Sequence, residues 1–460
     1  MDDSLMFERK NGFSDIEEDF RNSIFDFCDE YKDVLNKAKT EREFCSFAVE
    51  TLERAGFEKL SDKVKLSTGD KVYYVNRGKS VAAFVIGSEN ITNGVNIVAA
   101  HIDSPRLDLK PMPLYEQEGF AFLKTHYYGG IKKFHWYNIP LSIHGVVVKK
   151  DGSVLNITFG EDLAEPVLCI TDLLPHLSGM YNSKSISEAF EAEKLNVIAG
   201  NIPCEEAEKD KVKYGVLKLL NRKYGISEGD FLSGELEIVP ALSARDMGFD
   251  SSMITGYGQD DRVCAYTALR AITEIEKPQR TAVCLFVDKE EIGSMGNTGA
   301  QSRNFENILA KVCSLCGEYN DLVLRECLSN SRCLSADVGA AYDPNFAEVF
   351  DARNSARINE GLVIMKCVAS AAKSGSNDGN AEFVADVRRI FDENDVQWQI
   401  GEYGKVDLCN VGTISKFMAN LGADVIDCGV PVLAMHSPAE VTGKFDIYMA
   451  YKGYKVFLNS

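Results

Sequence analysis

Apolar residues recur at helical spacing through the first part of the chain. Between residues 14 and 55 they are separated mostly by three or four positions, which predicts helices that bury one face. Shorter apolar runs follow at 71–76, 80–86 and 95–100 and predict strands. The run 95–100 is almost continuously apolar, which is typical of a strand buried on both faces. The chain therefore opens with helices that lead into a buried sheet.

The pattern changes between residues 107 and 246, where short alternating segments predict an antiparallel sheet. Residues 143–148 and 154–158 alternate in this way, and the turn-forming Lys150-Asp151-Gly152 between them predicts a hairpin. Residues 177–213 are polar and poorly periodic, so we expect a long exposed loop there. We interpret 107–246 as an inserted β-rich domain.

After residue 258, helical and strand-like patterns alternate. Helices are predicted at 262–275, 304–316, 378–394 and 413–421, and strands at 281–287, 362–368, 398–401 and 424–428. This alternation predicts an α/β fold with a central, mostly parallel sheet and helices on both faces. Residues 1–106 and 247–460 would then form one domain that the insertion interrupts.

Composition narrows the classes of function. With 50 Lys and Arg against 69 Asp and Glu, the net charge of -19 opposes attraction to nucleic acid or to an anionic bilayer. The sequence has no 18-residue apolar run and no apolar signal-peptide core near Met1, so we expect a cytoplasmic protein without membrane contact. The thirteen cysteines include one C-x-x-C pair, Cys313 and Cys316, and we expect reduced, buried thiols.

Metal-ligand residue types stand directly after two predicted strands. His101 and Asp103 follow the first buried strand, and Glu290 and Glu291 follow the strand 281–287. The carboxyl ends of strands are where open α/β sheets place their sites. A lone histidine in such a place is more often structural, and adjacent glutamates can simply be solvated. Two carboxylates at a buried strand end nevertheless suit a metal ligand beside a proton acceptor.

Three more segments add ligand types. Asp260 and Asp261 precede a helix, where the alternative role is an N-cap. Asp337 lies in a loop of small residues, and His436 follows another apolar run. Each signal is weak alone. Together the two imidazoles and several carboxylates form a mixed nitrogen and oxygen set that suits zinc, cobalt or manganese, and a carboxylate can bridge two such ions.

The order of these motifs resembles the aspartyl aminopeptidase family, in its bacterial branch, over almost the whole chain. The series is His101-x-Asp103-Ser104-Pro105, Asp260-Asp261, Glu290-Glu291-x-Gly293-Ser294, Ser335-Ala336-Asp337 and Met435-His436-Ser437. The β-rich insertion is also similar to that family's extra domain. The resemblance implies a metalloaminopeptidase with two divalent ions, zinc foremost and cobalt or manganese as alternatives. Its substrates would be peptides with a free N-terminus, with acidic N-terminal residues among them.

The resemblance also implies a role for each ligand-type residue. His101 and Asp337 would hold one ion, Glu291 and His436 the other, and Asp260 would bridge both, while Glu290 would be the general base and Asp103 would support His101. The peptide between Asp260 and Asp261 would be cis. Dimers formed through the insertion would assemble into a dodecamer.

Other functions stay open at this point. A dinuclear deacylase or carboxypeptidase can have a similar metal set, and an inactive oligomeric scaffold can keep the same fold. His135, His144 and Lys366 are candidate substrate contacts, each with a structural role as the alternative.

Overall fold

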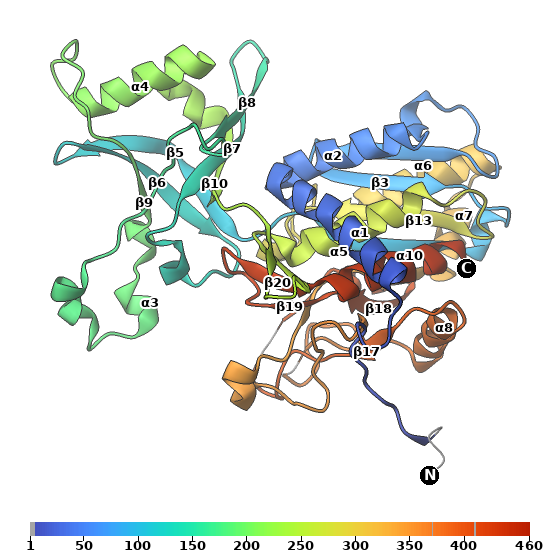
Figure 1. Ribbon diagram of the computed structural model, residues 1–460. Helices are drawn as coiled ribbons and strands as arrows, with labels where there is room; N and C mark the ends of the chain where they lie inside the picture. Colours follow the sequence, from blue (N-terminus) through green and yellow to red (C-terminus); the bar gives the residue numbers. More distant parts are fainter. Residues whose placement is uncertain (1–4, 370, 409–410) are drawn as a thin grey trace. The chain divides into compact units, whose positions relative to one another are not determined.

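The computed structural model describes residues 5–369, 371–408 and 411–460, and the chain divides into two compact units (Figure 1). The first unit comprises Met1–Asp103, Ala244–Met435 and Glu440–Ser460. The second comprises Ser104–Ser243 together with the short segment His436–Ala439. The second unit is thus an insertion in the sequence of the first.

The first unit is built on a nine-stranded sheet within the described residues. Its order is β1 (Glu58–Lys59), β2 (Lys71–Asn76), β3 (Ser80–Val85), β13 (Thr281–Val287), β4 (Val95–His101), β14 (Arg332–Ser335), β18 (Asp424–Gly429), β16 (Leu362–Met365) and β17 (Trp398–Ile400). Five of the eight neighbouring pairs are parallel, among them the consecutive pairs from β13 to β18. The predicted central, mostly parallel sheet is confirmed.

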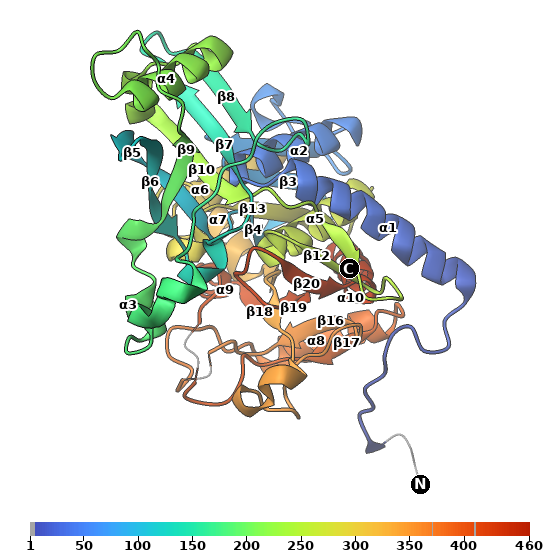
Figure 2. The ribbon, with the colours of Figure 1, turned by 60° about the vertical axis from the view of Figure 1, so that its left-hand side comes forward.

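Helices cover both faces of this sheet (Figure 2). On β4, Val98 and Ala100 pack into one apolar cluster, whereas Ile97 and Ala99 pack into another, because successive strand residues point to opposite faces. The first cluster includes α1 (Glu18–Lys37), α2 (Glu41–Arg54), α5 (Gln259–Thr273), α8 (Ala381–Asp392) and α10 (Lys444–Asn459). The second includes α6 (Asn304–Cys316), α7 (Asp321–Ser329) and α9 (Ser415–Ala419). The two-sided packing explains why β4 is apolar along almost its whole length.

Local sequence determines where two of these helices begin. At α2, the Thr40 hydroxyl accepts from the Glu43 N–H at 3.2 Å, and the Glu43 carboxylate accepts from the Thr40 N–H at 3.1 Å. This reciprocal capping satisfies two donors that the helix cannot pair itself. At α5, Gly258 has φ 72°, a left-handed conformation that suits glycine and turns the chain into the helix. Among the described residues, no helix combines the length and the apolar character needed to cross a bilayer.

A five-stranded sheet in the first unit brings distant segments to the start of α5. It consists of β11 (Arg245–Met247), β12 (Met253–Gly256), β20 (Glu440–Gly443), β19 (Pro431–Leu433) and β15 (Gly339–Ala340). In the antiparallel pair of β12 and β20, Gly256 lies opposite Glu440. Because α5 begins three residues after Gly256, this register holds Glu440 near the beginning of that helix.

The second unit contains an antiparallel six-stranded sheet. Its order is β8 (Val154–Phe159), β7 (Leu141–Val148), β10 (Gly234–Pro240), β5 (Arg106–Gln117), β6 (Phe120–Tyr128) and β9 (Asn196–Gly200), and α4 (Lys211–Tyr224) packs against it. The predicted hairpin is confirmed, since β7 pairs with β8 from Ile143 opposite Phe159 to Val148 opposite Val154.

The prediction of one long exposed loop at 177–213 is wrong. That region contains a 3-10 segment (Pro175–Tyr181), α3 (Ile186–Ala189) and the strand β9, which pairs with β6. Val197 is fully buried on β9. The strand has only five residues and lies at the edge of its sheet, so its sequence carries too few apolar positions for a periodic pattern.

Candidate metal centre and active site

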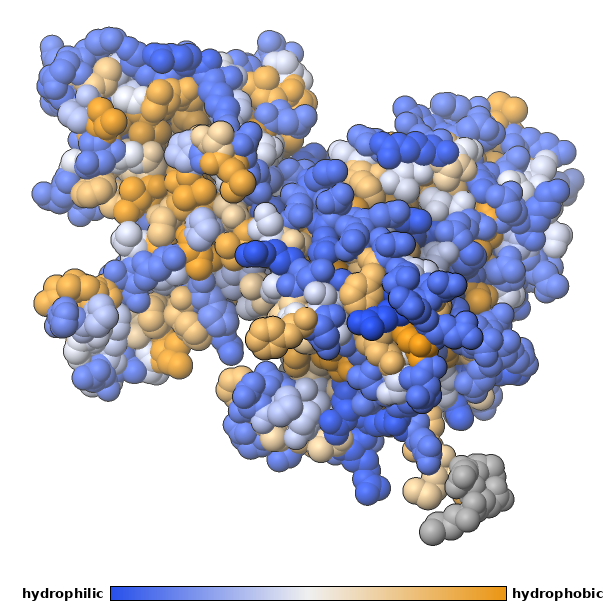
Figure 3. Space-filling model, in the orientation of Figure 1, coloured by the Kyte–Doolittle hydropathy of each residue, from blue (hydrophilic) through white to orange (hydrophobic). Residues whose placement is uncertain are grey.

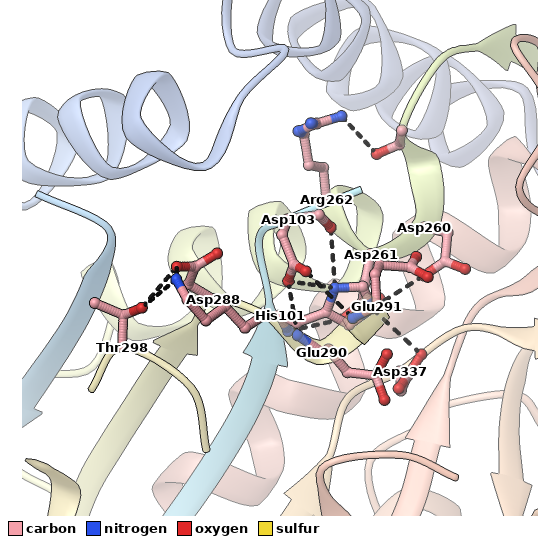
Figure 4. A network of polar contacts seen from close by, with 12 residues as sticks. His101, Asp103, Asp260, Asp261, Arg262, Asp288, Glu290, Glu291, Thr298 and Asp337 are labelled. Carbon is pink, nitrogen blue, oxygen red and sulfur yellow. Dashed lines mark hydrogen bonds and ion pairs between the residues drawn. The ribbon is translucent and has the colours of Figure 1, made fainter. Parts of the chain in front are cut away.

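Three adjacent parallel strands deliver ligand-type residues to one edge of the first unit's sheet (Figure 4). His101 is the last residue of β4, and Asp337 lies two residues beyond β14. Glu290 and Glu291 lie in a 3-10 turn that follows β13. Asp260 is at the start of α5. Side chains separated by more than two hundred residues in sequence thus meet at the carboxyl edge, as expected for an α/β sheet.

His101 lies at the centre of the cluster. Its Nε2 is 3.1 Å from Asp260 Oδ1 and 3.9 Å from Asp337 Oδ1. There are two groups, His101 with Asp260 and Glu291, and His101 with Asp261 and Asp337. In each group, one ligand atom from every residue lies within 4.8 Å of those of the other two. Glu291 is half-buried and the others are buried. One imidazole among several carboxylates is a donor set that fits zinc.

Asp103 contacts both His101 and the turn that carries Glu290 and Glu291. Its Oδ1 accepts from the Glu290 N–H at 3.1 Å and its Oδ2 from the Glu291 N–H at 3.2 Å. Its backbone carbonyl lies 3.0 Å from His101 Nδ1, and its Oδ1 is 3.3 Å from the same nitrogen. When Nδ1 donates to these oxygens, Nε2 faces the carboxylates, where a protonated Nε2 donates to Asp260 Oδ1 and loss of that proton would leave a lone pair for a cation. Asp103 therefore orients both the histidine and the glutamate turn.

The electrostatics of the cluster favour a cation. Burial opposes a charged imidazole, but hydrogen bonds to Asp103 and Asp260 outweigh it and raise the pKa of His101 well above its ordinary value. Burial also raises the pKa of Asp261 and of Asp337 far above the usual range, although the charge of His101 opposes this rise, and neighbouring carboxylates add to it. The protein alone keeps protons in this cluster, and a divalent cation would replace them.

Two acids that we did not assign as site residues from the sequence support the cluster. The Asp260 N–H donates to Glu440 Oε2 at 3.1 Å, and Asp261 Oδ2 accepts from the His101 N–H at 3.3 Å. The peptide between Asp260 and Asp261 is cis, as the family resemblance implied. Glu440 is the first residue of β20, and all four residues of this strand are buried. The sequence signal for Glu440 is no more than an acid at the start of a short strand.

Hydrogen bonds among Asp288, Lys289 and Thr298 also stabilise the turn that carries the two glutamates. Lys289 Nζ donates to Asp288 Oδ2 at 2.5 Å and to Thr298 Oγ1 at 2.8 Å, and the Thr298 hydroxyl donates to the same Asp288 oxygen at 2.7 Å. Lys289 itself has φ 69°. These contacts fix the backbone immediately before Glu290.

Each of the remaining candidate residues has its own local surroundings. His436 belongs to the second unit, where its Nδ1 lies 2.8 Å from the Gly130 carbonyl oxygen. His144 is buried in the second unit, with Nε2 2.9 Å from Glu161 Oε1.

His135 makes an edge contact with Phe134, at 4.4 Å between ring centroids, and burial lowers its pKa. Lys366 lies in the first unit and lines a cavity of about 450 Å³ beside Trp398.

Comparisons with known proteins agree with this geometry. Residues 34–458 match the family model described as aminopeptidase I zinc metalloprotease (M18). A probable M18 family aminopeptidase 1 of Clostridium acetobutylicum is 48% identical over 465 residues, covering 100% of both chains. The crystal structure of an M18 family aminopeptidase from Thermotoga maritima has a TM-score of 0.95 at 45% identity, covering 99% of this chain and 100% of that one.

A more distant structure has the same fold. The mApe1 dodecamer of S. cerevesiae is 22% identical with a TM-score of 0.75, covering 96% of this chain and 97% of that one. The predicted fold class, the enzyme class and the family resemblance are confirmed. Of the three functions that the sequence left open, the metal-dependent aminopeptidase is the one that agrees with both the relatives and the buried ligand cluster. The chain belongs to the aminopeptidase I family of zinc metalloproteases, M18.

Proposed function

We propose that this M18 aminopeptidase removes N-terminal residues from peptides with two divalent ions bound in the buried cluster. The observation that carries this proposal is the pair of overlapping ligand groups that share His101. More carboxylates converge there than one cation needs, which suits a dinuclear site. The ligands would be His101 and Asp337 for one ion, Glu291 and His436 for the other, and Asp260 as the bridge.

The contact of His436 supports its assignment as a ligand. When its Nδ1 donates to the Gly130 carbonyl at 2.8 Å, the neutral ring carries its lone pair on Nε2. Metal-binding histidines commonly have this arrangement, because the second hydrogen bond fixes the tautomer that binds the ion. Zinc is the first candidate for both positions, with cobalt and manganese as alternatives.

Glu290 is the proposed general base. Bound divalent ions would supply Lewis acidity, which lowers the pKa of water and polarises the scissile carbonyl. The Glu290 carboxylate is close enough for its charge to raise the pKa of Asp337, so it lies beside the ligand cluster. It would accept the proton of the attacking water and then donate it to the leaving amine. Asp103 would hold Glu290 in place through its backbone N–H.

The substrate class follows from charge. A cluster of carboxylates stabilises a positively charged or metal-bound α-amino group, whereas an acetylated N-terminus offers neither charge nor a basic lone pair. We therefore propose free-amine peptides as substrates, acidic N-terminal residues among them. A deacylase with a similar metal set would have the opposite requirement.

A metal-restoration assay tests this function. The protein is treated with chelator, and zinc, cobalt or manganese is added back separately before assay on free-amine aminoacyl substrates with acetylated controls. Activity that returns with metal and only on free amines is the expected result. Cleavage restricted to acetylated substrates would reject the aminopeptidase mechanism, and a lack of cleavage with every metal would reject catalysis by this cluster.

We also propose that the inserted domain, residues 107–246, mediates homo-oligomerisation through dimers that assemble into a dodecamer. On the face shown in Figure 3, apolar residues gather over the six-stranded sheet of the second unit. The large exposed apolar side chains of this unit include Met112, Phe120, Tyr127, Val167 and Leu219. Exposed apolar groups of this kind mark interaction surfaces, and the related mApe1 forms a dodecamer. Light scattering that finds a monomer at micromolar concentration would refute this assembly.

A further inference from the structure

An apolar cavity of about 450 Å³ lies inside the second unit, between α4 and the six-stranded sheet. Each of the six strands contributes an apolar side chain to its wall, among them Ile143 on β7, Ile157 on β8 and Leu236 on β10. From α4, Leu220 adds to the wall. The described lining residues all lie between positions 109 and 236, and none of them belongs to the ligand cluster around His101.

The cavity lies on the face of the sheet that α4 covers. In the pair of β7 and β8, Ile143 lies opposite Phe159, and both line the cavity. Directly opposite residues of an antiparallel pair share a face, and the wall that they share with Leu220 shows that this face points toward α4. The helix packs mainly on β5, β6 and β9, whereas the cavity also reaches β10, β7 and β8. The helix therefore leaves part of this apolar face open to another occupant.

The wall suits an alkyl chain better than water. Of the described lining residues, only Arg222, Lys223 and Tyr224 have polar side chains, and they are consecutive at the end of α4. A buried water needs roughly two to four polar partners, and the other side chains of the wall offer none. Cavities lined by Leu, Ile and Phe bind apolar molecules instead. The volume is within the range of small-molecule sites, about 300–1,000 Å³.

The polar end of the cavity is cationic. Lys223 Nζ forms an ion pair with Glu165 and lies 5.1 Å from the centroid of the Phe159 ring in the cavity wall. Arg222 is exposed, and no carboxylate of the described residues forms an ion pair with it. Its guanidinium is therefore open to an anion from solution, and the planar N–H groups match the geometry of a carboxylate.

We infer that this cavity binds medium-chain fatty acids as their anions. The alkyl chain lies among the apolar side chains between α4 and the strands β10, β7 and β8. The carboxylate pairs with the Arg222 guanidinium at the end of α4. This binding function is independent of the proposed peptidase chemistry, because it uses no residue of the ligand cluster.

Calorimetric titration of the zinc-loaded full chain with octanoate, decanoate and dodecanoate tests the alkyl site. Each added CH₂ should tighten binding roughly fourfold, as expected when that group moves from water into an apolar wall. Dodecylammonium, which has an equal chain but a positive head group, should bind more weakly than dodecanoate. An affinity that does not depend on chain length, or equal affinities for the two head groups, would overturn the inference. Absence of binding, which is also the outcome if a second copy of the chain covers the cavity, would overturn it as well.

Two variants locate the site. Ala199→Phe on β9 fills the cavity with a ring, so the affinity for dodecanoate should fall at least about tenfold, while the urea midpoint of unfolding stays the same or rises. Arg222→Gln removes the cation, so the affinity for dodecanoate should fall roughly three- to fivefold and the affinity for dodecanol should not change. Lys209→Gln, at an exposed position of the same unit outside the cavity, is the control. Wild-type affinity for dodecanoate in both Ala199→Phe and Arg222→Gln would refute this site.

Discussion

Asp103 contacts both His101 and the turn of Glu290 and Glu291, although it is not a proposed ligand. Its carboxylate accepts from two backbone N–H groups of the glutamate turn, and its carbonyl and carboxylate lie beside the imidazole of His101. At the scale of single residues, the site thus depends on oriented acceptors as much as on the ligands themselves.

Replacing Asp103 by Asn tests this positioning. The amide would turn a donor toward one of the two N–H groups, so the turn that carries Glu290 and Glu291 should shift. We expect zinc affinity to fall about 10–100-fold, measured by competition with a chromogenic chelator. Asp70→Asn, a change in a surface turn of the same unit, is the control. Unchanged affinity in Asp103→Asn would contradict the role.

Replacing Glu290 by Gln tests the general base. Glutamine keeps the size of the side chain but cannot accept the proton of water, so kcat should fall about 10²–10⁴-fold. The zinc content, measured by mass spectrometry, should stay at the wild-type level. Glu306→Gln on α6 is the control and should keep full turnover. A Glu290→Gln enzyme with wild-type kcat would exclude this residue as the base.

The burial of Asp427 predicts that the free energy of unfolding depends on pH. It is fully buried on β18, the Thr413 hydroxyl donates to its Oδ1 at 2.6 Å, and burial raises its pKa to about 6 from 3.8. Because the folded-state pKa is the higher one, the unfolded chain loses the proton first. The contribution of this group to stability is therefore full below pH 4, falls between about pH 4 and 6, and stays low above that range.

The change in unfolding free energy caused by Asp427→Asn should therefore be more favourable at pH 8 than at pH 4. The difference between the two pH values should be up to about 3 kcal/mol. Urea unfolding of the variant and the wild type at pH 4, 6 and 8 measures the difference. A difference in unfolding free energy that stays constant with pH would show that Asp427 does not titrate as described.

Sequence patterns singled out His101, Glu290 and Glu291 because these residues stand at or directly after the ends of apolar strands, and their catalytic and metal-binding roles stay predictions. Asp261 and Glu440 were not assigned as site residues, since their importance depends on tertiary pairing. Asp261 reaches the backbone of His101, and Glu440 reaches Asp260 only because β20 pairs with β12. No local pattern encodes such a register.

At the scale of elements, apolar runs with sharp ends were predicted best. The predicted strand 281–287 and helix 304–316 coincide with β13 and α6. The helix predicted at 413–421 is shorter, Ser415–Ala419, because Thr413 instead bonds the Ser415 N–H and Asp427. The side chain of Thr413 thus competes with helical hydrogen bonding, as hydroxyl residues do near helix starts.

The start of α2 gives an element-scale prediction. Thr40 is buried and takes part in reciprocal capping with Glu43. Thr40→Ala should lower the free energy of unfolding by about 1 kcal/mol, because the Glu43 N–H loses its acceptor. Chemical denaturation followed by circular dichroism measures this loss. Ser46→Ala, at an exposed position of the same helix, is the control, and equal effects of both changes would argue against capping.

At the scale of the whole molecule, metal should stabilise the fold. Burial raises the pKa of Asp261 and Asp337, so removing a cation near neutral pH leaves carboxylates that must bind protons or repel one another. Zinc at 100 times its Kd should add about 2.7 kcal/mol of stability. The difference in Tm between zinc-loaded and chelated protein, measured by calorimetry, should shrink as the pH falls. A Tm that chelation does not change would contradict metal binding in this cluster.

The central position of β4 has a consequence for how the protein is made. This strand lies between β13 and β14, and the amide of Asn96 on it donates to the carbonyl of Ser460 at the other end of the chain, at 2.7 Å. On a ribosome that adds about 5–20 residues per second, β14 emerges roughly 10–50 seconds after β4. The insertion is complete before either partner strand exists. His101, at the end of β4, is therefore made well before Glu291 and Asp337, so the ligand cluster can assemble only after most of the chain has been synthesised.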